Sequence, residues 1–248
     1  MKNLTKLAAL LLAATAATAT PALAQEEAAD SITLAGSAGL VSQYRFRGIS
    51  LSDEELAAQA GISATHESGF YVGTWASSLA GFGSFGGSNV EVDIYGGYST
   101  ALSESTTIDA GLLWYLYPGT DGTDYAEPYA SIKTTFGAVT AKLGVAYAPD
   151  QDAIGSGDNL YVYGDLSTGF AESPVVVKAH LGYSTGDSSL TPTGDYLDWL
   201  VGADFTWKSL TFGVAYVDTD ISSGDAAAAA FDRDIVDSAV VFSLTAAF

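Results

Sequence analysis

Apolar and polar residues alternate with a period of two over most of this chain. In the segment 196–207, for example, Leu197, Val201 and Phe205 alternate with Asp198 and Asp204. A period of two places one row of side chains on each face of a β-strand. About twelve segments keep the pattern over a length that crosses a bilayer as a tilted strand; they are 32–46, 56–66, 70–79, 90–100, 107–117, 125–136, 139–148, 160–170, 175–184, 196–207, 210–217 and 235–248.

The connections between these segments are long and short in strict alternation. The long ones are rich in Gly, Asp and Ser and cover 47–55, 80–89, 118–124, 149–159, 185–195 and 218–234. The short ones cover 67–69, 101–106, 137–138, 171–174 and 208–209. Long outer loops, tight periplasmic turns and an even number of strands are typical of transmembrane antiparallel β-barrels. The sequence therefore predicts an all-β barrel of about twelve strands with both ends on the periplasmic side.

The aromatic residues add two expectations about the barrel. Tyr44 and Phe46 fall near the predicted outer ends of strands and Trp207 near an inner end, where amphipathic rings favour the level of the lipid headgroups. The last segment carries an apolar row that finishes on Phe248, which suits the closing strand of an outer-membrane barrel. We expect the barrel-assembly machinery to bind the chain through Phe248.

The first residues predict export. Lys2 and Lys6 precede an apolar stretch at 7–17, and Ala22-Leu23-Ala24 gives the small-x-small pattern of a cleavage site. The apolar stretch is too short to span a bilayer as a helix. We expect a cleaved signal peptide over 1–24, an outer-membrane β-barrel over 25–248, and outer-membrane lipids and lipopolysaccharide as partners in the cell outer membrane.

Composition narrows the possible partners. The formal net charge is −20 and becomes −22 once Lys2 and Lys6 are removed with the signal peptide. Such acidity argues against nucleic acid as a partner, because phosphates would be repelled. With 48% hydrophobic residues the chain is not a disordered acidic tail. It has no Cys, so no disulfide framework is expected.

Three segments carry a resemblance to a known family. They read VSQYRFRGIS at 41–50, SGFYVGTWAS at 68–77 and EVDIYGGY at 91–98. In order and spacing they resemble a proteobacterial family described as porins, the Gcw_chp or TorF family, and the first motif is the most specific of the three. The resemblance implies an outer-membrane barrel and supplies no catalytic residues.

Strand parity places charged side chains of both signs inside the barrel. From a spacing of ~4.8 Å between tilted strands, twelve strands give a backbone radius of roughly 12 Å, and side chains would leave a passage of about 5 Å radius. Two interpretations are open: a charge-lined lumen that orients hydrated solutes, or matched charges that pack a narrow interior. The proposed lumen-lining residues are Arg45, Arg47, Glu91, Asp93, Lys133, Lys178 and Asp198.

Arg45 and Arg47 are the sharpest candidates among them. Both are expected on the face opposite Tyr44 and Phe46 near the outer mouth, where they would meet an anionic solute or Glu91 and Asp93. The planar guanidinium suits either task, because it binds carboxylates through two hydrogen bonds at once. A structural ion-pair role is the favoured interpretation, because polar barrel interiors commonly contain such networks.

Catalysis and metal binding find little support in the sequence. His66 and His180 are the only histidines, and no nucleophile-elbow pattern is present. The spacing Asp218-x-Asp220 falls short of a calcium-binding EF-hand loop. We therefore expect no enzyme activity, no catalytic residues, no cofactor and no metal.

These observations favour a porin-like outer-membrane channel that admits small polar solutes by passive diffusion. The first alternative is a plugged structural or adhesive barrel that acts through its acidic outer loops. The second alternative is a soluble periplasmic β-sandwich that binds a ligand.

Overall fold

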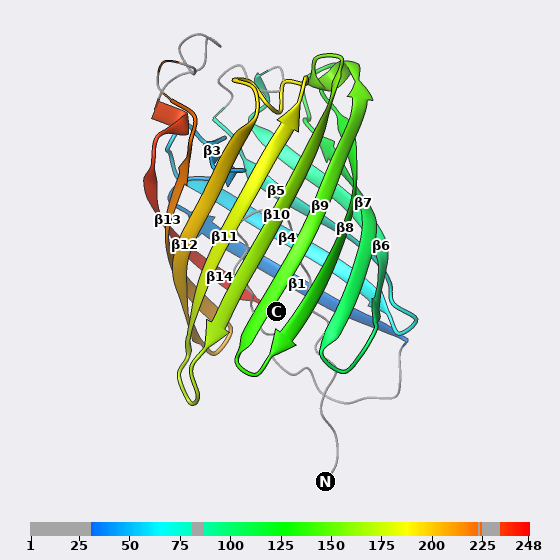
Figure 1. Ribbon diagram of the computed structural model, residues 1–248, viewed down its shortest axis with the longest axis vertical. Helices are drawn as coiled ribbons and strands as arrows, with labels where there is room; N and C mark the ends of the chain where they lie inside the picture. Colours follow the sequence, from blue (N-terminus) through cyan, green and yellow to red (C-terminus); the bar gives the residue numbers. More distant parts are fainter. Residues whose placement is uncertain (1–30, 81–86, 223, 225–233) are drawn as a thin grey trace.

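The computed structural model describes residues 31–80, 87–222, 224 and 234–248, and these form a closed antiparallel β-barrel (Figure 1). The predicted signal peptide at 1–24 lies outside the described residues. The wall has twelve strands: β1 Ile32–Val41, β4 Ala57–His66, β5 Phe70–Ser78, β6 Val90–Ala101, β7 Thr106–Leu116, β8 Tyr125–Phe136, β9 Val139–Gln151, β10 Gly157–Gly169, β11 Val175–Gly186, β12 Tyr196–Trp207, β13 Leu210–Thr219 and β14 Ala239–Ala247.

The barrel closes through its first strand. Each strand from β4 to β14 pairs with its neighbour in sequence, and β1 pairs with both β4 and β14. This arrangement confirms the predicted all-β barrel of about twelve strands. It also excludes the alternative of a β-sandwich, because a sandwich would divide these strands between two packed sheets.

The two faces of the wall differ as the alternation predicts. On β12, Val201 and Phe205 point outward and are 57% and 44% exposed, whereas Asp198 and Asp204 point inward and are 3% and 4% exposed. The other strands repeat this arrangement, so large apolar side chains cover the outside of the barrel. An outer apolar band around a polar interior is the arrangement of barrels that stand in a bilayer.

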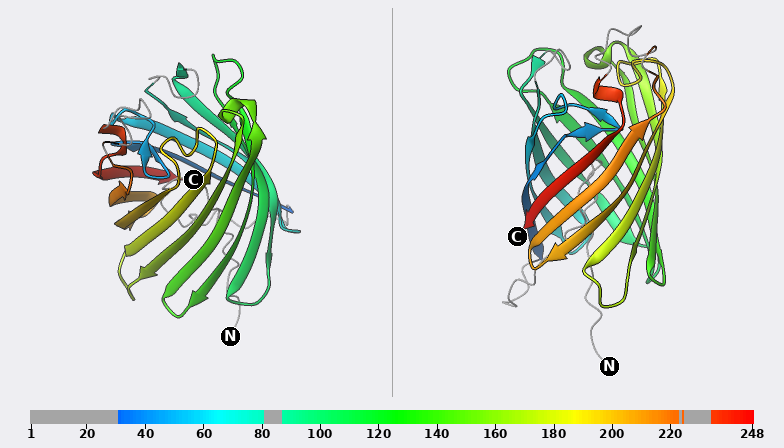
Figure 2. Two further views of the ribbon diagram at one scale, coloured as in Figure 1. Left: turned by 45° about the horizontal axis from the view of Figure 1, so that its top comes forward. Right: turned by 90° about the vertical axis from the view of Figure 1, so that its left-hand side faces the viewer.

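All short turns lie at one end of the barrel and all long connections at the other (Figures 1 and 2). The described ends of the chain belong to the short-turn end, where Glu67 N donates to Ser31 O and Ala247 N donates to Ser209 O. We call the two ends the short-turn end and the long-loop end. No helix in the described part of the chain is long and apolar enough to cross a membrane.

The first strand is shorter than predicted, which is the main correction to the expected topology. The segment 32–46 was expected to be one strand, but β1 ends at Val41 and the chain then turns into the barrel. There it forms a small hairpin of β2, Arg45–Phe46, and β3, Ile49–Ser50. A two-residue period is common to a wall strand and an inward hairpin, so the alternation alone does not separate them.

The last predicted strand is also shortened. Instead of beginning at residue 235, β14 begins at Ala239 and follows a 3-10 turn, η3, at Asp234–Val236. Ile235 and Val236 are buried against Ile49 and Tyr196. A second 3-10 turn, η2, at Asp152–Ile154 joins β9 to β10. Apolar residues near a strand end therefore serve packing at the mouth of the barrel as well as the outer surface.

Candidate channel constriction

A buried hairpin enters the barrel from the long-loop end. Residues 44–52, which we call the inward hairpin, are all buried. Its turn places Arg47 and Gly48 at positive φ, 48° and 82°, the backbone of a type I′ turn that matches the twist of a two-residue hairpin. A Cβ on Gly48 would collide with the Thr219 methyl group and approach Asp198 Cβ. The tip therefore packs tightly against β12 and β13.

Arg47 fixes the hairpin to the opposite part of the wall. Its guanidinium donates to Glu127 Oε1 at 2.5 Å on β8 and to Asn159 Oδ1 at 2.6 Å on β10. It also lies over the Phe46 ring at 4.7 Å and the Tyr161 ring at 4.2 Å. Burial by itself lowers the pKa of the Arg47 guanidinium, but Glu127 raises it, and the net pKa lies above its ordinary value. Arg47 therefore stays charged inside the barrel.

Arg45 contacts different residues from those that Arg47 contacts. Its guanidinium donates to the carbonyl oxygens of Gly48 at 2.8 Å and Asp237 at 2.7 Å, and lies 3.5 Å from Glu54 Oε1. The sequence suggested Glu91 and Asp93 as partners of the two arginines, and this pairing is wrong. The hairpin turn separates the two side chains, so that Arg45 ties the hairpin to the segment before β14 and Arg47 ties it to β8 and β10.

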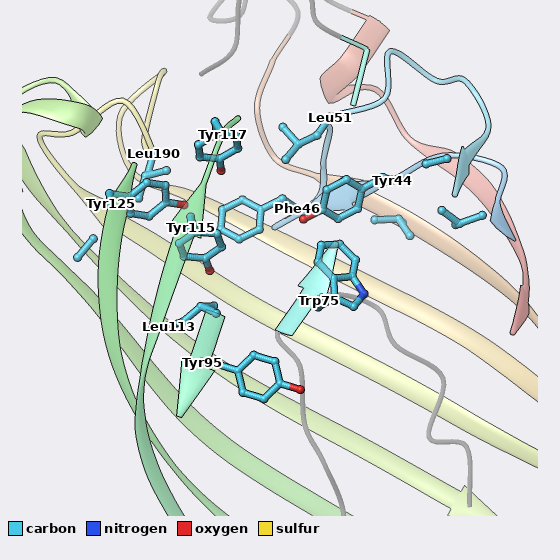
Figure 3. Close-up of a cluster of buried hydrophobic side chains, with 14 of the residues drawn as sticks. Tyr44, Phe46, Leu51, Trp75, Tyr95, Leu113, Tyr115, Tyr117, Tyr125 and Leu190 are labelled. Carbon is cyan, nitrogen blue, oxygen red and sulfur yellow. The ribbon is translucent and has the colours of Figure 1, made fainter. Parts of the chain in front are cut away.

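Aromatic side chains fill the space around the hairpin (Figure 3). Tyr44 meets Trp75 edge to face with ring centroids 5.3 Å apart, and Phe46 meets Tyr115 in the same way at 5.8 Å. Tyr115 in turn stacks on Tyr125 at 4.4 Å. Tyr44 and Phe46 were expected in an outer lipid-facing belt, and this expectation is wrong because the chain that carries them leaves the wall after Val41.

The inward hairpin and this ring cluster together form what we call the constriction. The hairpin contacts wall strands on every side of the interior, from β5 and β6 at Tyr44 to β12 and β13 at Gly48. Leu190, in the connection between β11 and β12, packs into the same cluster. The constriction therefore narrows the long-loop half of the barrel.

Paired charges line the wall below the hairpin tip. His180 on β11 lies between two carboxylates, with Nδ1 2.6 Å from Asp165 and Nε2 3.2 Å from Asp198, and Nε2 is 2.8 Å from the Tyr161 hydroxyl. Lys178 Nζ donates to Asp204 Oδ1 at 2.8 Å. Interior charges are costly unless matched, and these pairs meet that need.

The remaining lysines are arranged differently. Lys133 on β8 and Lys142 on β9 are directly opposite in register, and the Lys142 ammonium lies 4.7 Å from the centre of the Tyr163 ring. Neither makes a salt bridge within 4.0 Å to another residue of the described ranges. The wall therefore presents two neighbouring positive charges to the interior.

Inward tyrosines lie across glycines on the neighbouring strand. Tyr163 covers Gly144 and Tyr95 covers Gly73, each its direct partner in register. A Cβ on either glycine would collide with the covering ring. The missing side chain lets the ring lie along the wall instead of projecting toward the axis, which leaves more room in the interior.

The remaining candidates for chemistry are His66 and a possible metal site. His66 Nδ1 is 2.6 Å from Ser68 Oγ at an exposed short turn, and Ser68 N also donates to it at 3.1 Å. These contacts close the turn locally. Within the described residues, no three His, Cys, Asp or Glu side chains are placed to hold a metal ion together.

All seven residues proposed from parity to line the lumen face the interior or belong to the inward hairpin: Arg45, Arg47, Glu91, Asp93, Lys133, Lys178 and Asp198. Two partners at the constriction were missed. The long connection expected at 149–159 includes Asn159, and Tyr161 was not among the proposed lumen-lining residues. Asn159 lies on β10 with a fully buried side chain, and the inward parity of Tyr161 with Tyr163 was the available signal.

Solved structures share this fold. A KdgM porin superposes with a TM-score of 0.58 at 9% identity, covering 86% of this chain and 98% of its own. A NanC porin gives 0.59 at 9% identity, with 87% and 99% covered. The COG4313 outer membrane channel from Pseudomonas putida F1 gives 0.50 at 9% identity, with 89% and 96% covered. At such low identity the likeness establishes the outer-membrane barrel fold.

Sequence comparison assigns the family. No curated protein matches the chain. The family Gcw_chp, described as a bacterial protein of unknown function, matches residues 25–248 and so includes the inward hairpin and every wall strand. The chain therefore belongs to the Gcw_chp family.

Proposed function

We propose that this protein is an outer-membrane channel through which small polar solutes diffuse passively. The observation that carries the proposal is the contrast between the apolar outer face and the charge-lined interior, with the inward hairpin narrowing one half. The apolar outer face suits a bilayer, and the charged inner wall offers a surface that hydrated solutes can contact.

The similar solved structures also support this function. Two similar folds are called porins and a third is called an outer membrane channel. We propose that the porin role implied by the name TorF also holds for this chain. We propose that Arg47, Glu91 and Asp93 set the narrowest point. Arg45 would hold the hairpin in place, and Lys133, Lys178 and Asp198 would line the wider half.

The proposal includes the route to the membrane. The peptide 1–24 would direct export, and Phe248 would present the closing strand to the barrel-assembly machinery. Outer-membrane lipids and lipopolysaccharide would then surround the apolar face. The proposed function is passive diffusion along an inner wall that holds ion pairs and tyrosine hydroxyls, and it involves no chemical step.

Liposome swelling with solutes of graded size tests the function. Vesicles that contain the purified protein should swell in small amino acids and short sugars and resist larger oligosaccharides. Vesicles with heat-denatured protein are the control. If no solute enters, while a variant with residues 43–52 replaced by a short Gly-Ser linker admits them, the protein is a plugged barrel and the acidic outer loops become its working surface.

A further inference from the structure

Three inward carboxylates belong to the wall around the constriction, and only one of them has a cationic partner. Glu91 and Asp93 stand two residues apart on β6, and Glu127 stands on β8. Their residues are 1%, 4% and 2% exposed. Arg47 makes a salt bridge with Glu127, whereas neither Glu91 nor Asp93 makes one within the described ranges.

Hydrogen bonds hold Glu91 in place without neutralising it. Its Oε1 accepts from the Tyr44 hydroxyl at 2.6 Å, and its Oε2 accepts from the Tyr117 hydroxyl at 2.9 Å. Tyr44 belongs to the inward hairpin and Tyr117 follows β7. The two hydroxyls orient the carboxylate and leave its charge uncompensated.

Asp93 has fewer hydrogen-bond partners than Glu91. Its Oδ1 is fully buried and accepts no hydrogen bond from the described residues. In register it lies between Trp75 on β5 and Tyr115 on β7, and Tyr95 follows it on the same face of β6. Figure 3 shows these three aromatic side chains around one part of the interior. Asp93 thus points into a space bordered by rings.

A buried carboxylate without a partner is expensive, and two neighbouring ones repel each other. A cation from solution would relieve both costs at once. Carboxylate and hydroxyl oxygens suit hard cations, and ring faces attract positive charge within about 6 Å. Because fewer than three acidic or histidine ligands converge among the described residues, a monovalent cation fits this donor set better than a divalent one.

We propose that Glu91 and Asp93 form a binding site for a monovalent cation in the constriction. The site would hold potassium, sodium or a primary ammonium group between the two carboxylates and beside the rings of Trp75 and Tyr115. Its consequence for permeation rests on the proposed channel function: cations would be favoured over anions at the narrowest point.

Unfolding temperature tests the site independently of conduction. Purified protein in detergent is heated in potassium chloride and, at equal ionic strength, in the chloride of the large cation N-methyl-D-glucamine. Potassium should raise the midpoint by about 2–4 °C. Asp93→Asn should abolish this difference and should itself fold well, because it removes an unpaired buried charge. Glu91→Gln, whose amide oxygen can accept from one tyrosine while its NH2 group donates to the hydroxyl oxygen of the other, should reduce it.

Asp109→Asn is the matched control, because Asp109 is an inward carboxylate outside the constriction that accepts from Tyr71 at 3.0 Å. It should keep the full potassium effect. If wild-type protein melts at the same temperature in both salts, no cation binds. The pair then shares a proton instead, and the proposal is overturned.

Reversal potentials across a planar bilayer test the consequence for permeation. In a potassium chloride gradient the wild-type channel should prefer potassium, and Asp93→Asn should lower the potassium-to-chloride permeability ratio several-fold. A channel that prefers chloride would overturn the proposal. A protein that conducts no ions at all would contradict the proposed function instead, and the unfolding experiment would still decide whether the cation site exists.

Discussion

Arg47 holds more of the constriction together than any other single residue described here. It joins the inward hairpin to β8 through Glu127, to β10 through Asn159 and to two aromatic rings. Its side chain and that of Glu127 are 4% and 2% exposed. In such surroundings, removal of one member of an ion pair leaves the other as a buried charge without compensation.

Arg47→Ala should therefore lower the free energy of unfolding by about 3–5 kcal/mol. The double variant Arg47→Met with Glu127→Gln should recover most of the loss, since it removes both charges. Denaturant unfolding, followed by the gel shift of the heat-modified barrel, measures both. Equal losses in the single and double variants would show that the ion pair itself does not matter.

Gly144 tests the arrangement of tyrosines along the wall. A Cβ at Gly144 would meet the Tyr163 ring, so Gly144→Ala should turn that ring toward the barrel axis and reduce conductance. Gly164→Ala on the adjoining strand is the control, because its Cβ would meet nothing nearer than Lys142 O at 3.8 Å. If both variants conduct like wild type, the position of the Tyr163 ring does not set the width of the passage.

The sequence predicted which charged residues face inward but not how they pair. The alternation along each strand is a local property that the fold preserves, so Glu91, Asp93 and Asp198 all face the interior as predicted. The pairing of Arg47 with Glu127 joins residues 80 positions apart. That contact depends on a hairpin turn whose Arg-Gly sequence lacks the Asn-Gly or Asp-Gly signal of type I′ turns.

At the scale of elements, the inward hairpin is the part of the chain that occupies the interior of the barrel. β2 and β3 have only two residues each, which is too little for an independent hairpin. The wall supplies the missing stability through the Tyr44, Phe46 and Arg47 contacts. The hairpin therefore depends on the fit of its tip against β12 and β13.

Gly48→Ala tests that fit. The new methyl group would collide with Thr219, and the left-handed backbone would cost about 1–2 kcal/mol besides. The tip should lift from the wall and conductance should rise. Gly119→Ala separates the two causes, because Gly119 also has positive φ, 89°, but nothing lies within 4 Å of its Cβ. Similar conductance in both variants would mean that the tip contact does not shape the passage.

At the scale of the whole molecule, the closed wall follows from the bilayer as solvent. Every backbone group in hydrocarbon must pair within the protein, and a barrel without edges satisfies this need. The alternation of apolar and polar residues, and of long and short connections, reflects this closed wall in the sequence. The number of strands and the position of the turns were therefore predictable. The inward turn after Val41 was not predictable, because the residues that follow it have a pattern that suits a wall strand as well as a hairpin packed inside the barrel.

Val201→Lys tests whether the outer face stands in lipid. Val201 is 57% exposed in the middle of β12, and a lysine near the bilayer centre should reduce stability in lipid vesicles by about 2–4 kcal/mol. Ser103→Lys, at an exposed short turn, should change stability little. Equal stability of the two variants in urea titrations would argue that Val201 does not meet hydrocarbon.

Single-channel conductance in a planar bilayer tests the central claim most directly, by comparing wild-type protein with a variant in which residues 43–52 are replaced by a short Gly-Ser linker. The account predicts small, discrete current steps for wild type and much larger steps for the variant, because the hairpin narrows a passage that is otherwise open. Steps of equal size in both proteins, or silence in both, would contradict it.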